Sequence, residues 1–379
     1  MKLTYLDYAA TTPPLPEVQA AMVKAMEAGY GNASALHSAG HAAGYAVGKA
    51  RASVARLINA KPEEIIFTSG GSEANNTVAE IFRNKRVATS AIEHPSVLEA
   101  MRARASECQV IPVDHAGRVD PEQVPQDIDL VSVMLASNEL GTLEPVAEIV
   151  KRCKKHNILV HTDATQAIGK IKVDVEALGV DYLTFSAHKL GGPIGVGALY
   201  VRSGAPYRPL ILGGHQEGKR RAGTSNTIGI IGIGTAANWC WDNWSCKLFA
   251  EKVRPLRDEL KARILQEVPY SSCNTPNEDC LPNILNMSFQ AAEGESIQLY
   301  LDAEGVMVST GSACAAGDIK PSHVLMAATG DAEVAHSSIR FSLGLETTRE
   351  DIEYVMSVLP GIVKRLQGIS TIKIKEEHE

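Results

Sequence analysis

The sequence contains few aromatic residues and no long hydrophobic run. Only 5% of its 379 residues are Phe, Trp or Tyr. The longest apolar stretch, around residues 227–241, includes Gly, Thr and Asn, so it is too short and too mixed to cross a bilayer. No apolar segment typical of a signal peptide follows Asp7 near the N-terminus. These observations predict a soluble, cytoplasmic protein that does not bind a membrane.

Cysteine pairs with metal-binding or redox spacing are absent as well. The seven cysteines are odd in number, and no two of them form a Cys-x-x-Cys pair. This pattern argues against a zinc site and against a secreted disulfide framework, and it predicts mostly reduced, buried thiols. Positive charge is not in excess either. The 37 Lys and Arg residues stand against 44 Asp and Glu residues, a net charge of −7, so nucleic acid is not an expected partner.

The remaining composition is that of an ordinary globular chain, with 45% hydrophobic and 21% charged residues. Short β-branched runs alternate with amphipathic stretches such as 145–156. This alternation predicts an α/β fold with a mostly parallel sheet that is covered on both faces. The predicted strands are 65–68, 86–89, 109–113, 130–135, 159–162, 182–185 and 197–201.

The pattern changes after about residue 250. A long charged helix is predicted over 251–267, and scattered strands follow near 284–289, 306–309 and 338–342. This part of the chain is therefore predicted to form a smaller α+β domain. The GxxGxG pattern at 229–234 has no convincing strand before it, so a helix that packs through small residues explains it better than a phosphate loop does.

In open α/β sheets, ligands bind beyond the carboxyl ends of the strands, so the residues that follow each predicted strand are informative. Gly71 and Ser72 lie in a glycine-rich turn between a strand and a helix, where free backbone N–H groups suit a phosphate. A plain turn with Ser72 as helix cap is the alternative. Asp163, at a buried strand end, needs a donor such as a protonated ring nitrogen, and Gln166 is placed to bond a ring substituent. Helix capping by Asp163 is the alternative.

The stretch 186–193, Ser-Ala-His-Lys-Leu-Gly-Gly-Pro, is more specific. A lysine rarely follows a buried strand without a function. Lys189 is therefore a candidate for a covalent imine bond to an aldehyde cofactor, since burial readily lowers the pKa of a lysine amine. Ser186 and His188 flank it as donors. The alternative is a surface lysine on a loop.

Three further clusters fit around such a cofactor. His94 follows the strand at 86–89 and is suited to stack on a ring or to shuttle protons. Asn138 follows the strand at 130–135 and is suited to bond a phenolic oxygen or a substrate carboxylate. Residues 220–224, Arg-Arg-Ala-Gly-Thr, form a basic loop suited to a phosphate. The alternatives are a purely structural histidine and a solvated pair of charges.

One cysteine lies in unusual surroundings. Cys314 is embedded in Ser-Thr-Gly-Ser-Ala-Cys-Ala-Ala-Gly-Asp, where no large residue would bury it. A thiol in an accessible loop is placed to react, whereas the other six cysteines have bulkier or helical neighbours. An incidental cysteine in a small-residue turn is the alternative.

Taken together, these residues resemble one known family. The blocks that carry the resemblance occur in this order: YLDYAATTP, YGNASALH, FTSGGSEANN, EHPSV, SNELGTLEPV, HTDATQAIGK, FSAHKLGGPIGVGALYVR, GGHQEGKRRAGT, STGSACAAG and SSIRFSLG. They span residues 5–343, nearly the whole chain. The sequence is similar to the pyridoxal-phosphate-dependent cysteine desulfurases of the NifS/IscS type.

The resemblance implies a type I aminotransferase fold and a homodimer with shared active sites. The large domain with its seven-stranded sheet is expected over 15–247, and the small domain over 1–14 and 248–379. Lys189 corresponds to the lysine that binds the cofactor covalently. The other implied cofactor contacts are Asp163 at the pyridinium nitrogen, Gln166 near the phenolic oxygen, His94 stacked on the ring, Gly71, Ser72, Ser186 and His188 at the phosphate, and Thr224 lent to the phosphate of the other subunit.

The resemblance also implies the reaction. Asn138 and Arg340 would hold the carboxylate of L-cysteine, and Cys314 would take the sulfur as a persulfide and pass it to an acceptor such as an iron–sulfur scaffold protein. The sequence departs from the family pattern at two places: Ser72 replaces a usual Thr, and the catalytic loop continues as Ala-Ala-Gly-Asp at 315–318, where the family often carries Ser. A selenocysteine lyase or another aminotransferase-like enzyme, and a non-catalytic interaction protein on the same scaffold, are the competing hypotheses.

Overall fold

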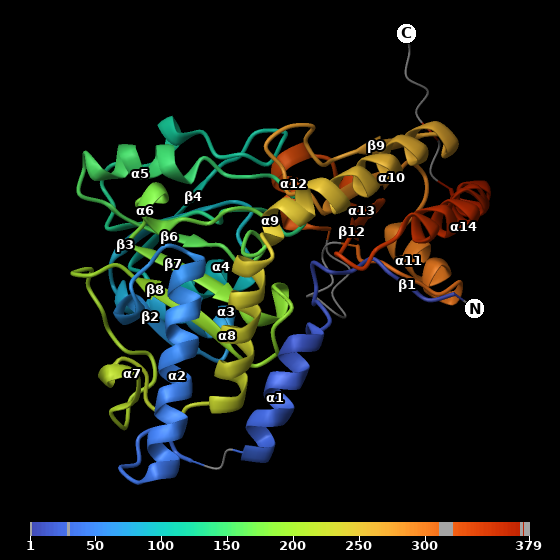
Figure 1. Ribbon diagram of the computed structural model, residues 1–379. Coiled ribbons are helices and arrows are strands. Elements are labelled where there is room, and N and C mark those ends of the chain that lie inside the picture. Colours follow the sequence, from blue (N-terminus) through green and yellow to red (C-terminus); the bar gives the residue numbers. More distant parts are fainter. Residues whose placement is uncertain (1, 29–30, 311–320, 372–373, 375–379) are drawn as a thin grey trace.

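The computed structural model describes residues 2–28, 31–310, 321–371 and 374. Cys314 therefore lies outside the described residues. The described chain forms a large lobe built around one sheet and a smaller lobe that contains both termini of the described chain (Figure 1). None of the helices in this described part is long and apolar enough to cross a membrane.

The sheet of the large lobe has seven strands in the order β2-β8-β7-β6-β5-β3-β4. Only β8 runs antiparallel to its neighbours, which confirms the predicted mostly parallel sheet. The largest differences from the sequence prediction are in β4, which begins and ends two residues earlier, and in β5, which ends after three residues, whereas β3, β6 and β7 each end one residue later. The bounds are β2 Ile65–Thr68, β3 Arg86–Ser90, β4 Glu107–Ile111, β5 Leu130–Ser132, β6 Leu159–Asp163, β7 Tyr182–Ser186 and β8 Gly197–Val201.

Helices cover both faces of this sheet (Figure 1). Neighbouring side chains of β2 show the expected alternation, since Ile66 packs in one core while Ile65 and Phe67 pack in the other. Helices α3 (Gly71–Ile81) and α4 (Pro95–Arg104) contribute to the first core, and α2 (Ser38–Leu57), α5 (Val146–Lys154) and α8 (Thr227–Asp242) contribute to the second. Shorter or peripheral helices are α1 (Pro16–Ala28), α6 (Val175–Leu178) and α7 (Gln216–Lys219).

Helix α8 contains the GxxGxG pattern and is the predicted packing helix. A side chain at Gly234 would collide with the backbone of Ala50, since its Cβ would lie 2.6 Å from the Cα atom. A side chain at Gly232 would meet Pro193. The glycines thus let α8 approach α2 and the turn after β7 closely. This close packing fixes the turn that carries Lys189.

The smaller lobe has its own core and two small sheets. Strands β12 (Ser338–Ser342), β10 (Ile284–Phe289) and β9 (Ser271–Cys273) form an antiparallel sheet, and β1 (Thr4–Tyr5) pairs with β11 (Val306–Met307). The predicted helix at 251–267 begins later, as α10 (Arg254–Glu267), after the π-helical turn Phe249–Val253. The remaining helices are α9 (Ser245–Leu248), α11 (Gly294–Ala303), α12 (His323–Thr329), α13 (Ala332–His336) and α14 (Arg349–Ile369).

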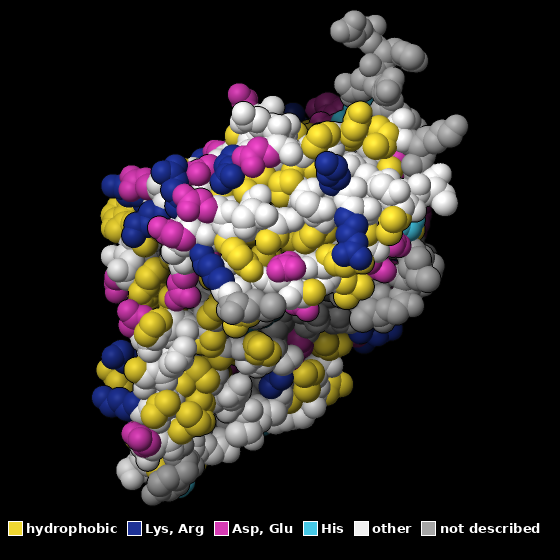
Figure 2. All heavy atoms as spheres, turned by 90° about the vertical axis from the view of Figure 1, so that its right-hand side faces the viewer, with side chains coloured by type: hydrophobic (Ala, Val, Ile, Leu, Met, Phe, Trp, Pro, Cys, Tyr) yellow, Lys and Arg dark blue, Asp and Glu magenta, His cyan; other side chains and the backbone are white. Residues whose placement is uncertain are grey.

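The hydrophobic core of the smaller lobe draws on Leu6 and on residues from Val253 to Leu366. This membership supports the proposed division of the chain near residues 14 and 247. On the side of the molecule that carries the smaller lobe, basic and acidic side chains are interspersed, without a large area of one sign (Figure 2).

Candidate active site

The predicted site residues meet at one edge of the large sheet. Gly71 and Ser72 follow β2, His94 follows β3, Asn138 follows β5, Asp163 ends β6, and Ser186 ends β7 just before Lys189. All these strands run in the same direction, so their carboxyl ends share one edge. The charges of Asp163 and Lys189 both act on the ring of His94. The turn at Gly71 lies close to the ends of β6 and β7, because a Cβ atom built on Gly71 would lie 3.4 Å from Oγ1 of Thr165 and 3.9 Å from Cβ of Ser186.

The amine of Lys189 lies beneath the N-terminal segment. Its Nζ donates hydrogen bonds to the backbone carbonyls of Ala9 and Ala10, the latter at 2.6 Å. The same segment is tied to the turn of Lys189 through Thr12, whose Oγ1 donates to the carbonyl of His188 and accepts from the N–H of Gly191. The lysine is therefore held by backbone groups from a part of the chain about 180 residues away.

A second lysine supports this turn. Lys170 is 2% exposed, and its Nζ donates a 3.0 Å hydrogen bond to the backbone carbonyl of Lys189. Burial, reinforced by the charge of Lys189, lowers the pKa of Lys170 to about 7. Sequence reasoning missed this residue. The sequence signal that could have identified Lys170 is its position as the last residue of the HTDATQAIGK block, which also contains Asp163 and Gln166.

Asp163 is held as an acceptor. It is 7% exposed, its Oδ1 accepts the N–H of Thr165 at 2.9 Å, and its Oδ2 accepts the side-chain amide of Asn75 at 2.8 Å. Both oxygens of the side chain therefore act as hydrogen-bond acceptors. The alternative role of Asp163 as a cap is limited to the contact with the backbone N–H of Thr165. Asn75, which is fully buried, was not predicted as a site residue.

The ring of His94 caps α4. Its Nδ1 accepts the backbone N–H of Ser96 at 3.1 Å and lies 2.8 Å from the Ser96 hydroxyl. Burial lowers the pKa of His94, and the charge of Asp163 only partly offsets this effect. At neutral pH the imidazole is therefore uncharged.

The turn after β2 provides an anion site. Helix α3 begins at Gly71 without a side-chain cap, and its N-cap residue Gly70 has a φ of 155° that L side chains rarely adopt. The first backbone N–H groups of α3 therefore point to the site edge, where the dipole favours a phosphate. Ser186 is adjacent, since its Oγ would lie 3.7 Å from a Cβ at Gly70. The His188 ring instead contacts the hydroxyl of Thr11 at 3.1 Å.

Several buried polar atoms near the site have no hydrogen-bond partner among the described residues, and Thr165 Oγ1 and Gln166 Oε1 are two of them. The Gln166 amide nitrogen bonds the carbonyl of Ala9 at 2.9 Å. Orphaned buried oxygens are costly, and a ligand with donors or a bound water would satisfy them. An uncapped helix for a phosphate, a buried carboxylate for a ring nitrogen and a lysine amine for an aldehyde together fit pyridoxal phosphate.

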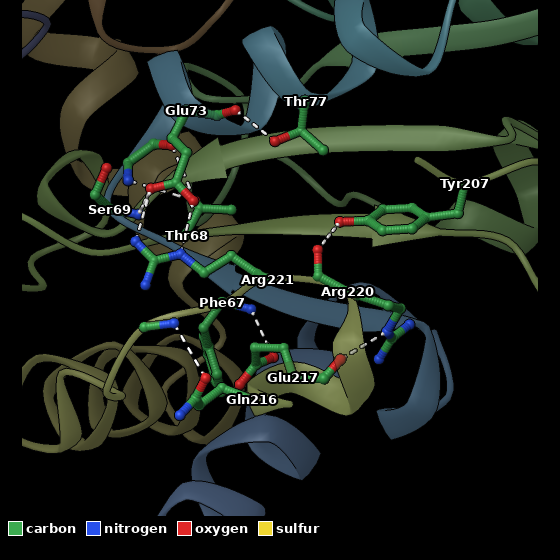
Figure 3. Close-up of polar contacts among 12 residues, drawn as sticks. Phe67, Thr68, Ser69, Glu73, Thr77, Tyr207, Gln216, Glu217, Arg220 and Arg221 are labelled. Atoms are coloured by element: carbon green, nitrogen blue, oxygen red, sulfur yellow. Dashed lines mark hydrogen bonds and ion pairs between the residues drawn. The ribbon is translucent and has the colours of Figure 1, made fainter. Parts of the chain in front are cut away.

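The basic loop at 220–224 is built differently from the sequence prediction (Figure 3). Arg221 pairs with Glu73 of α3 at 2.9 Å, and the same carboxylate accepts the N–H of Ser69 in the phosphate turn at 2.8 Å. Arg220 donates to backbone carbonyls, among them that of Glu63 at 2.7 Å. Both guanidinium groups are therefore engaged within the protein, and the loop presents Thr224 on its exposed side.

Glu217 anchors the other end of this loop. It pairs with Arg51 through two 2.7 Å contacts. It also accepts the N–H of Phe67 at 3.1 Å (Figure 3). Its φ of 48° is uncommon for a residue with a side chain. These contacts hold the loop against β2, next to the phosphate turn.

The structure brings together Asn138 and Arg340, the two residues predicted to bind the substrate carboxylate. Arg340 is 4% exposed and donates to the backbone carbonyl of Asn138 at 3.0 Å. A second N–H group pairs with the carboxylate of Asp7 at 2.7 Å, and Nε has no hydrogen-bond partner among the described residues. Asp7, which sequence reasoning did not assign, thus already occupies one side of the guanidinium.

Comparisons with known proteins agree with this geometry. The family model described as Aminotransferase class-V matches residues 4–355. A cysteine desulfurase IscS from Dictyoglomus turgidum is 45% identical over 382 residues, which are 97% of this chain and 96% of that protein. A solved NifS-like protein has a TM-score of 0.85 and 36% identity, covering 97% of this chain and 99% of its own. SspA in complex with cysteine has a TM-score of 0.78 and 30% identity, covering 91% and 100%.

The chain belongs to the class-V aminotransferase family, and it is a pyridoxal-phosphate-dependent enzyme with the type I fold. Within this family it belongs to the cysteine desulfurases of the NifS/IscS type. The resemblance seen in the sequence is thereby confirmed.

Proposed function

We propose that this enzyme converts L-cysteine to L-alanine and passes the sulfur through a persulfide on Cys314 to an acceptor protein, such as an iron–sulfur scaffold. The observation that carries the proposal is the meeting of Lys189, Asp163 and His94 at the carboxyl edge of the sheet. The membership of the chain among the cysteine desulfurases supports the choice of substrate.

When bound, pyridoxal phosphate supplies an aldehyde for the substrate amine and a ring that takes up the electrons released at Cα. Lys189 would hold the cofactor through its Nζ and would move the Cα proton of the substrate with the same atom. Both roles require that Nζ leaves the carbonyls of Ala9 and Ala10. Asp163 keeps the ring nitrogen protonated. Gly71, Ser72 and Ser186 would hold the phosphate, and His188 would join them through Nε2, since its Nδ1 contacts Thr11. Gln166 would bond the phenolic oxygen of the ring.

Arg340 and Asn138 are proposed to hold the substrate carboxylate. The unpartnered Nε of Arg340 supports this role, because a buried guanidinium N–H without an acceptor is unfavourable. Asp7 keeps the guanidinium in place from the other side. A carboxylate bound by Arg340 is thereby oriented relative to the turn of Lys189.

Cys314 lies outside the described residues, and its role is proposed from the sequence. The thiols of five of the six other cysteines support the choice. Burial raises the pKa of Cys108, Cys246 and Cys273, and it raises the pKa of Cys153 and Cys240 to about 11. Such thiols are weak nucleophiles at neutral pH. In the transfer, the sulfur of cysteine bonds to Cys314, the C–S bond of the substrate breaks, and its carbon gains a proton to give alanine.

Both ends of the segment that carries Cys314 are attached to the site. The backbone of Ser309 pairs with that of Arg340, and the hydroxyl of Ser322 donates to Glu139 at 2.5 Å. Glu139 follows Asn138 directly. These two attachments support the proposal that Cys314 serves the site at this sheet edge.

A homodimer with Thr224 contacting the phosphate in the partner subunit is also proposed. Large apolar side chains are exposed on α1, α2 and the loops after β7 and β8, which is typical of an interface. They are Val23, Met26, Tyr45, Ile194 and Leu212. A reducing compartment, such as the cytoplasm, is proposed because the six described cysteines are all free.

The reaction is tested by incubating the enzyme with L-cysteine and measuring alanine and sulfide together in the presence of a reductant. Equimolar release supports the proposal. Formation of 3-mercaptopyruvate and no alanine would contradict it and favour an aminotransferase. Turnover of selenocysteine with none of cysteine would contradict it and favour a selenocysteine lyase.

A further inference from the structure

Four polar side chains form a continuous chain from Asp163 to His94. Asp163 accepts one hydrogen of the Asn75 amide at 2.8 Å, and the other hydrogen of that amide is donated to the hydroxyl of Ser96 at 2.9 Å. The Ser96 hydroxyl in turn lies 2.8 Å from Nδ1 of His94. The four residues come from β6, α3, α4 and the turn before α4.

The direction of every hydrogen bond in this chain is fixed by its ends. A carboxylate only accepts, so the group of Asn75 that faces Asp163 is the NH₂ group. Ser96 uses an oxygen lone pair for the second amide hydrogen, which leaves its own hydrogen for Nδ1 of His94. The backbone N–H of Ser96, which is always a donor, points at the same Nδ1 at 3.1 Å.

We propose that Asn75 and Ser96 are positioning residues that hold His94 in the neutral form protonated on Nε2. Two donors converge on Nδ1, so this nitrogen has no room for a proton of its own. Any proton or hydrogen bond that His94 exchanges with a ligand then passes through Nε2, and Nδ1 takes no part.

The charged groups around the ring do not reverse this preference. Asp163 on β6 favours a protonated ring, whereas Lys189 after β7 and His323 on α12 oppose it. His323 itself is engaged, since its Nε2 lies 3.0 Å from the backbone carbonyl of Glu93. Burial of the His94 ring also disfavours its protonated form.

The consequence for catalysis rests on the proposed function, because it needs His94 to lie against the cofactor ring. There, Nε2–H would be a fixed hydrogen-bond donor. The tautomer of His94 is a property of the protein and is measured without the reaction. A wrong tautomer assignment and a wrong proposed function would therefore show up as separate results.

The test is ¹⁵N NMR of histidine-labelled enzyme, with and without cofactor, followed as a function of pH. In the wild type we expect His94 nitrogen shifts of a neutral ring protonated on Nε2. Ser96→Ala should raise the imidazolium fraction at a given pH about three- to tenfold, the equivalent of one lost hydrogen bond. Ser96→Thr, which keeps the hydroxyl, should restore the wild-type titration.

Asn75→Leu should shift the His94 titration in the same direction although Asn75 does not touch the ring, and this shift should vanish in the presence of Ser96→Ala. Asn76→Leu is the matched control. Its amide bonds the Ser72 carbonyl instead, so the His94 signals should stay unchanged. A ring protonated on Nδ1, an imidazolium at neutral pH, or an Asn75→Leu shift that persists with Ser96→Ala would overturn the proposal.

Discussion

Lys170 is the least expected charged group of the molecule, and replacing it with methionine makes a quantitative prediction. The side chain is 2% exposed and has the Lys189 carbonyl as a hydrogen-bond acceptor, with another lysine nearby. Lys170→Met has a similar shape and removes the ionisable group. Lys172→Met is the matched control, because Lys172 is 83% exposed and only two residues away.

The magnitude follows from the pKa of Lys170, which burial lowers from 10.5 to about 7. The unfolded chain therefore binds more protons than the folded chain between these two values. Stability must rise with pH across this window, by up to about 1.4 kcal/mol per pH unit. Between about pH 7 and pH 9 the wild type should gain about 2 to 3 kcal/mol relative to Lys170→Met.

The assay is urea unfolding of the cofactor-free proteins at equal protein concentration, at several pH values across this window. The difference between wild type and Lys170→Met should grow with pH, whereas the difference between wild type and Lys172→Met should stay flat. Parallel curves for all three proteins would refute the reasoning, since Lys170 would then remain charged in the folded state.

Three further predictions concern the cofactor site. Lys189→Ala should bind pyridoxal phosphate weakly and without a covalent bond, and an unchanged visible absorbance spectrum would contradict the assignment of Lys189. Asp163→Ala should keep the fold but lose about tenfold or more in activity, because the ring nitrogen then loses its proton, and wild-type turnover would be inconsistent with this role. Arg221→Met should weaken cofactor affinity about tenfold by freeing Glu73 and the Ser69 N–H, as measured by equilibrium dialysis. Unchanged affinity would show that the loop does not support the phosphate turn.

Much of the large lobe was predictable because its strands are short, fully buried and separated by clear helical patterns. The strands at 65–68 and 197–201 were predicted with the correct bounds. The early end of β5 was not, because Val133 and Leu135 continue the apolar run although only single hydrogen bonds continue the ladder. The two-residue strand β1 lacks a pattern of its own and forms only because β11 lies beside it.

The candidate site residues were predicted from their positions after strands, whereas the residues that contact and support them were not. The carbonyls of Ala9 and Ala10 carry no side-chain signal, and their contact with Lys189 exists only in the folded chain. Asn75 is one of two adjacent asparagines, and only helix geometry decides that it faces Asp163 while Asn76 does not. The arginines at 220–221 were expected at a phosphate because their actual partners, the carboxylate of Glu73 for Arg221 and the carbonyls of residues 63 and 65 for Arg220, lie far away in sequence.

The central claim, sulfur transfer through Cys314, is tested most directly with radioactive-sulfur cysteine in a single turnover without reductant. The wild type should carry a label that a reductant removes, and so should the control Cys273→Ser. Cys314→Ser should keep the visible spectrum of the bound cofactor and its response to cysteine, yet carry no label and release no sulfide. Turnover of cysteine by Cys314→Ser, or a label on Cys273 or Cys280, would contradict the account.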